Sequence, residues 1–143
     1  MSGIVLCALD IDQPDHETPV LLRAAQLAQL DSARLDVLTV LPEFHSESVA
    51  GYFPDDFYGQ AVEDAKARLS DFVAAVIGAE ANRTVRHLVA TGAVAEQVLR
   101  TAVDEDASLI VIGSHRPTMR DYLIGPNAAH VVRQAACSVF VVR

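Results

Sequence analysis

The feature that most constrains the fold is a series of five short apolar runs, each rich in Val, Ile and Leu. Such runs are typical of strands that are buried on both faces, as in a parallel sheet. None approaches the roughly 18 apolar residues of a membrane-spanning helix. The runs cover residues 3–10, 34–41, 84–90, 108–113 and 138–143.

Helical patterns lie between these runs. Thr18 and Pro19 predict the N-cap and first turn of the first helix. Apolar stripes at helical spacing predict core-facing sides; they consist of Val20, Leu21, Ala24, Leu27 and Ala28, then Ala61, Ala65, Leu69, Phe72, Val73 and Val76, then Val94, Val98, Leu99 and Ala102, and finally Ala128, Val131, Val132 and Ala135. Alternating strands and helices predict right-handed βαβ units in a doubly wound α/β sheet.

Length and cysteine content limit the organisation. Residues 1–143 have the length of one domain, which we expect to be single. Residues 42–60 mix aromatics, acids and glycines, which predicts a flexible flap. Cys7 and Cys137 are too few for a disulfide or metal framework, so we expect buried free thiols in a reducing compartment. No leader pattern opens the chain, and we expect a cytoplasmic protein.

The charge distribution points to a small anionic ligand. A formal net charge of −8 argues against bulk binding to nucleic acid or an anionic membrane. Residues 107–143, however, hold four arginines against one acid, Asp121. This local positive charge favours an anion near the C-terminal quarter, although unrelated surface arginines would give the same count.

A basic loop joins the fourth run to the last helix. His115, Arg116 and Arg120 lie between the run that ends at Gly113 and the helix that Gly125 and Pro126 open. Unpaired N–H groups at a helix N-terminus accept phosphate readily, and arginine neutralises it in bidentate fashion. Glycines allow the backbone to approach such a ligand closely. His115 and Arg120 are also consistent with solvated loop residues.

Ligands of parallel sheets bind beyond the carboxyl ends of the strands. The candidates there are Asp10 and Asp12 after the first run, Val40 in the second, Gly92 after the third and Gly113 in the fourth. Asp10 is equally compatible with a helix cap or a solvated turn, and Val40 with ordinary burial.

Several related classes are excluded by missing residues. The dinucleotide fingerprint and the P-loop lysine motif are absent. A phosphoacceptor receiver needs an aspartate after the third strand and a lysine after the fifth, but the third run ends in "LVATG" and Lys66 is the only lysine. The Ser-Gly-Gly phosphate loop of pyrophosphatases is missing from "LDIDQPD", and no nucleophile or metal constellation stands out.

The segments "IVLCALDID", "VLTVLP", "ATG" and "IGSHRP…YLIGPNAAHVVRQAACSVFVVR" resemble, in order, the universal stress protein family. The resemblance implies a Rossmann-like, five-stranded parallel sheet flanked by four helices, which binds adenine nucleotides and is usually a homodimer. The ATP-binding branch has a Gly-x-x-Gly, nine-residue, Gly-Ser/Thr pattern. Here Arg116 replaces its second glycine, the spacer is one residue shorter, and Pro126 replaces the Ser/Thr. A subgroup with a Ser-His-Arg-Pro loop shares the first two differences.

The resemblance also implies the site. Asp10 and backbone of Val40 would hold the adenosine, with Ala8 where relatives often carry proline. The phosphates would lie on the loop and the helix start, whose further members are Asn127 and Ala128. The implied ligand is ATP, ADP or AMP, alone or with Mg²⁺, whose ligands the sequence leaves open.

Two functions of different class remain. The first is an ATP-binding regulator of the stress response whose nucleotide state changes dimer or partner contacts. The second is a dimeric partner-binding protein that has lost nucleotide binding, as Pro126 suggests. No residue is an evident general base, so any ATPase activity would be slow. The apolar strand 138–142 would form an exposed edge, and the resemblance suggests that it pairs with a second copy.

Overall fold

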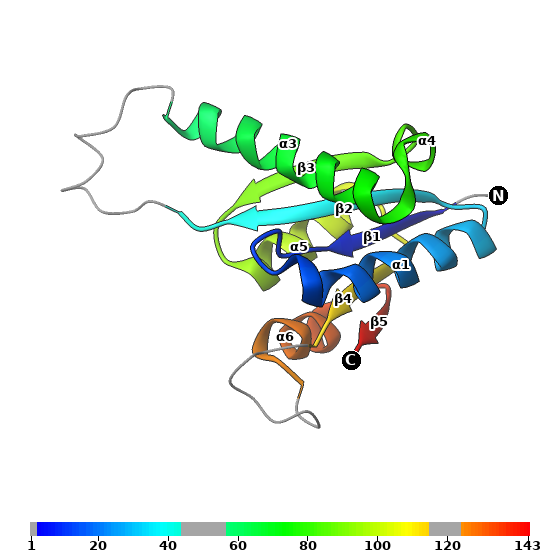
Figure 1. Cartoon of the computed structure of the whole chain (residues 1–143). Coiled ribbons are helices and arrows are strands. Elements are labelled where there is room, and N and C mark those ends of the chain that lie inside the picture. Colours follow the sequence, from blue (N-terminus) through cyan, green and yellow to red (C-terminus); the bar gives the residue numbers. More distant parts are fainter. Residues whose placement is uncertain (1–2, 44–56, 115–123) are drawn as a thin grey trace.

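The computed structural model describes residues 3–43, 57–114 and 124–143 (Figure 1). They form one parallel sheet of five strands in the order β3-β2-β1-β4-β5. The predicted α/β architecture is confirmed. The strands are β1 (Ile4–Ala8), β2 (Arg34–Leu41), β3 (Arg86–Thr91), β4 (Leu109–Gly113) and β5 (Ser138–Val142).

The central strand β1 divides the core into two layers. Val5 and Cys7 belong to the apolar cluster on one face, and Leu6 and Ala8 to the cluster on the other. Successive side chains of a strand point to opposite faces, so burial on both faces favours an apolar residue at every position. This is why the run from Ile4 to Ala8 carries no charged residue.

The helices cover both faces of the sheet (Figure 1). α1 (Pro14–Leu30) and α3 (Phe57–Ile77) pack on one face, and α5 (Val94–Asp104) and α6 (Pro126–Gln134) on the other. A short helix, α4 (Ala79–Asn82), follows α3. The four predicted helices are therefore present, together with one additional turn of helix.

The predicted start of the first helix is wrong. α1 begins at Pro14, and Pro19 lies inside it. Pro14 already occupies the first helical position, where a proline costs no hydrogen bond. The hydroxyl of Thr18 donates to the Pro14 carbonyl at 2.9 Å instead of capping a helix. The helix thus starts one turn earlier, and that turn includes Glu17.

Other expectations meet mixed outcomes. Val132, predicted in the core, is 48% exposed, because α6 directs Ala128 and Val131 toward the sheet. Cys7 is buried and Cys137 is half-buried, and both are free thiols. Residues 57–60 are helical, whereas residues 44–56 of the predicted flap lie outside the described residues.

Within the described ranges, no helix is long and apolar enough to cross a membrane.

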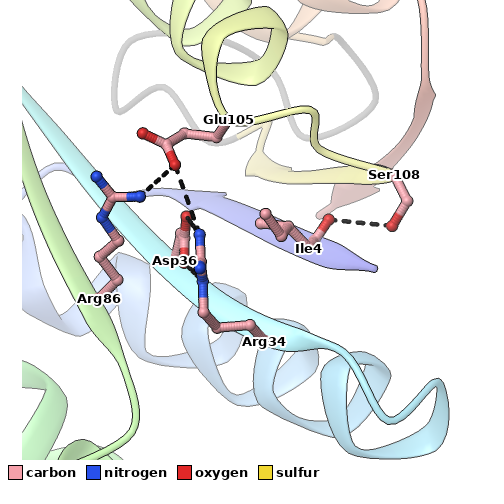
Figure 2. A network of polar contacts seen from close by, with 6 residues as sticks. All are labelled: Ile4, Arg34, Asp36, Arg86, Glu105 and Ser108. Atoms are coloured by element: carbon pink, nitrogen blue, oxygen red, sulfur yellow. Dashed lines mark hydrogen bonds and ion pairs between the residues drawn. The ribbon is translucent and has the colours of Figure 1, made fainter. Parts of the chain in front are cut away.

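A half-buried ion pair, between the buried Asp36 and the partly exposed Arg34, lies at the amino-terminal end of the strands (Figure 2). Asp36 in β2 is fully buried, and its two carboxylate oxygens accept from Arg34 Nε at 2.8 Å and Nη2 at 3.0 Å. The hydrogen bond from Arg34 to Asp36 raises the pKa of the guanidinium. Glu105, just after α5, contacts both Arg34 and Arg86. The cluster ties β2, β3 and α5 together at one end of the fold.

We expect Arg34→Ala to lower the free energy of unfolding by about 2–4 kcal/mol, because it leaves the Asp36 carboxylate buried without its cation. Arg83→Ala is the matched control, since Arg83 pairs with Glu80 where both side chains are exposed. Its cost should stay below about 0.5 kcal/mol. Urea denaturation measures both, and equal costs would contradict a buried, charge-dependent role for the pair.

Candidate functional site

The site lies at the point where the order of the strands across the sheet reverses. β1 and β4 are neighbours, but the chain continues from them to helices on opposite faces. Ligands bind at such a switch point, beyond the carboxyl ends of the strands. A cavity of about 240 Å³ opens there. It is lined by Ala8, Leu9, Asp10, Glu17, Leu38, Val40, Val94, Ile112, Gly113, Ser114, Gly125, Pro126, Asn127 and Ala128.

The structure brings most of the predicted site residues to this cavity. Among those it describes, only Asp12, after β1, and Gly92, after β3, do not line the cavity; the others come from β1 and the turn after it, β2, β4 and the start of α6. Gly92 has φ of +131° in the turn before α5, a conformation that favours glycine. Its N–H donates to the Leu41 carbonyl at 2.9 Å. His115, Arg116 and Arg120 lie outside the described residues.

Leu38 and Val40 of β2 line the cavity on one side of β1, and the start of α6, after β4, lines it on the other; these two sides are called its apolar end and its polar end. Leu38, Val40 and Val94 give the apolar lining. At the other end, α6 begins at Pro126, and its hydrogen-bond ladder starts with Ala129 N–H donating to the Gly125 carbonyl at 2.9 Å. N–H groups of a helix's first turn are not used by the ladder and face its amino-terminal end.

The two predicted glycines have a packing role. A Cβ on Gly113 would lie 3.0 Å from Val20 Cγ2, and one on Gly125 would lie 3.0 Å from the Ser114 carbonyl oxygen. Glycine at these positions therefore lets α1 and α6 approach β4. This explanation differs from the predicted one, in which the missing Cβ makes room for a ligand.

Asp10 shapes the turn between β1 and α1. Its Oδ1 accepts from Asp12 N–H at 3.0 Å, and its carbonyl accepts from Gln13 N–H at 3.0 Å. Asp12 turns away to Arg68, whose Nη2 lies 3.0 Å from Asp12 Oδ1. Asp10 therefore lines the cavity while Asp12 does not.

Glu17 is the charged residue of the cavity lining that the sequence analysis does not predict. Its Oε2 is buried and has no hydrogen-bond partner among the described residues. Burial raises the pKa of the Glu17 carboxyl to about 7; a hydrogen bond from the Asp10 backbone lowers it, and the Asp10 charge raises it. The signal was present, because Glu17 precedes the buried Val20 and Leu21 by three and four residues and so shares their helix face.

No group of three or more His, Cys, Asp or Glu side chains suited to a metal ion occurs in the part of the chain that the structure describes. The geometry accordingly assigns no metal ligands.

A cavity at the switch point of a parallel, doubly wound sheet is typical of α/β proteins that bind small ligands. The model of the universal stress protein family matches residues 1–143, and the chain belongs to that family. Universal stress protein G of Salmonella typhimurium is 30% identical over 145 residues, with 100% of both chains covered.

Solved structures share the fold. A universal stress protein in complex with cAMP has a TM-score of 0.68 at 20% identity, with 99% of this chain and 97% of the other covered. The universal stress protein from Archaeoglobus fulgidus in complex with dAMP has a TM-score of 0.64 at 22% identity, with 100% and 98% covered.

Glu17 makes the stability of the protein depend on pH. Between pH 4.5 and about 7 the folded protein retains a proton that the unfolded chain releases, so the free energy of unfolding falls as pH rises through this interval. We expect Glu17→Gln to remove this slope and to be more stable than the wild type above neutral pH by on the order of 1–3 kcal/mol.

Urea denaturation across this pH range tests the expectation. Asp15→Asn is the matched control, because it removes an exposed acid from the same helical turn and should leave the slope in place. The same slope in Glu17→Gln and the wild type would show that the Glu17 carboxyl does not titrate there.

Proposed function

We propose that this universal stress protein binds an adenine nucleotide in the switch-point cavity and acts as a dimeric regulator in the stress response, with residues 1–143 forming one domain. The observation that carries the proposal is the convergence of Ala8, Asp10, Val40 and the start of α6 on one cavity. These residues come from β1 and the turn after it, from β2 and from α6, and the sequence predicts that each contacts the nucleotide.

The two ends of the cavity suit the two ends of such a ligand. An adenine ring is flat and apolar on its faces, which matches the surface formed by Leu38, Val40 and Val94. Phosphates would lie at the other end, near the N–H groups of Asn127 and Ala128. Arg116 and Arg120, in the basic loop, would supply positive charge. The relatives with bound cAMP and dAMP support this choice of ligand class.

Pro126 distinguishes the proposal from its alternative, a dimeric partner-binding protein without nucleotide affinity. At the first helical position the proline preserves the start of α6. It lacks both the hydroxyl and the N–H that the Ser/Thr of the ATP-binding branch would offer a phosphate. The proposal requires that the remaining N–H groups of α6 and the arginines of the loop bind the phosphates without these two groups. The alternative becomes the better account if the wild type binds neither ATP nor adenosine.

We expect Asp10→Ala to weaken binding of both ATP and adenosine by about 1–3 kcal/mol, because polar groups of the adenosine lose their partner. Asp12→Ala is the matched control: it removes the same charge two residues later, where the side chain faces Arg68 rather than the cavity. Its effect should remain below about 0.5 kcal/mol. Isothermal titration calorimetry measures both, and equal effects would contradict a specific contact by Asp10.

The proposed dimer forms along β5, the edge strand next to β4. The Val142 carbonyl accepts from Ser114 N–H at 2.9 Å. Main-chain groups alternate in direction along a strand, so those of Val139 and Val141 point away from β4. An apolar edge of this kind is expected to pair with another strand, and a second copy of β5 would close it symmetrically.

We expect Val141→Pro to give a monomer or a precipitate, because proline removes an outward N–H without breaking the ladder to β4. Val141→Thr keeps the backbone donor and should remain dimeric. Size-exclusion chromatography with light scattering measures the oligomeric state of both variants. An intact Val141→Pro dimer would place the interface elsewhere.

A further inference from the structure

Glu17 lies in the wall between two adjoining cavities. The first is the switch-point cavity, and the second, also of about 240 Å³, extends toward the end of β5. Asp10, Glu17, Gly113 and Asn127 line both. Glu17 is therefore next to the polar end of the first cavity, where the phosphates of a nucleotide would lie.

The charges around this carboxyl are unbalanced. Asp10 and Glu17 line the first cavity, and no lysine or arginine does so among the described residues. Cys7 of β1 interacts electrostatically with Glu17, but burial raises the pKa of its thiol well above the ordinary value, so it stays neutral. His16 of α1 and Arg143 after β5 line the second cavity. An anion entering the first cavity thus meets two acids of its own sign in the described wall.

We propose that Glu17 couples anion binding to proton uptake, so that the cavity accepts an anionic nucleotide together with one proton held on the Glu17 carboxyl. The inference rests on the proposed nucleotide-binding function. The proton comes from solvent, adds to a carboxylate oxygen and leaves the carboxyl neutral. A buried oxygen without a hydrogen-bond partner tolerates the neutral form better than the charged form.

Neutralising Glu17 changes the electrostatics more than the shape of the site. Removing one negative charge beside the phosphates lowers the repulsion that an anionic ligand experiences, whereas a neutral ligand is nearly indifferent to it. The Glu17 carboxyl titrates near pH 7 in the free protein. A fall in pH across neutrality should therefore strengthen ATP binding and leave adenosine binding nearly constant.

Calorimetric titrations of the wild type and Glu17→Gln with ATP and adenosine test the coupling. At about pH 8.5 Glu17→Gln should bind ATP about tenfold more tightly than the wild type, and at about pH 5.5 the two should agree within about twofold. Comparing the two proteins at each pH cancels the titration of ATP itself. Adenosine should differ less than about twofold at both values, and Asp15→Asn should follow the wild type.

Three outcomes would overturn the inference. The first is that Glu17→Gln and the wild type bind ATP with the same affinity at high pH. This outcome would contradict the coupling but not the proposed nucleotide binding. The second is a pH dependence that persists in Glu17→Gln and vanishes in His16→Gln or His115→Gln. The third is an absence of binding by ATP and adenosine at any pH, in which case the proposed function and this inference fail together.

A measurement on the wild type alone tests the same coupling and does not require that a variant folds. Titrations with ATP in two buffers of different ionisation enthalpy give the number of protons taken up on binding. Just above neutral pH, ATP binding should be accompanied by uptake of a fraction of a proton by the protein, in addition to any proton that ATP itself takes up. Adenosine binding should be accompanied by no proton uptake. Equal proton uptake with both ligands contradicts the proposal.

Discussion

The structure depends on a central strand that is buried on both faces. β1 has apolar side chains toward α1 and α3 on one face and toward α5 and α6 on the other. β2 and β4 flank β1 in the sheet. The loop after β1 leads to a helix on one face and the loop after β4 to a helix on the other face, so the two loops separate. The cavity is a consequence of this separation. Its position is therefore set by the same burial that stabilises the sheet.

Two carboxyl groups show how the two ends of the sheet differ. Asp36, near the amino-terminal edge, is fully buried, but a bidentate bond from Arg34 compensates its charge (Figure 2). Glu17, at the opposite edge, has an oxygen that no described group bonds. The first arrangement is complete without a ligand and stabilises the fold. The second retains unsatisfied bonding capacity beside the cavity, as residues of binding sites often do.

The sheet could be predicted from the sequence because its strands are short runs rich in Val, Ile and Leu, and the central strand β1 is apolar throughout and buried on both faces. The sequence predicted the cavity residues of β1, β2 and α6 because carboxyl ends of parallel strands meet at one edge. The start of α1 was mispredicted because two prolines, Pro14 and Pro19, both fit the first helical position, and local rules do not rank them.

Tertiary packing accounts for the other differences. The space that Gly113 leaves for Val20 depends on how α1 lies on β4, which no local pattern encodes. Glu17 was overlooked because an acid in a first helical turn is ordinarily a solvated residue that favours the helix dipole. Only the packing of α1 against the sheet buries it. Val132 was placed in the core because its spacing fits the α6 stripe, yet it is 48% exposed.

Backbone NMR of the full chain during titration with ATP tests whether the switch-point cavity holds an adenine nucleotide. If it does, the amide signals of Ala8, Val40 and Ala128 should shift in a saturable way. The signals of Arg34, Asp36 and Arg86, at the opposite edge of the sheet, should remain in place. Saturable shifts confined to that opposite edge, or no shifts at all with millimolar ATP, would contradict the account.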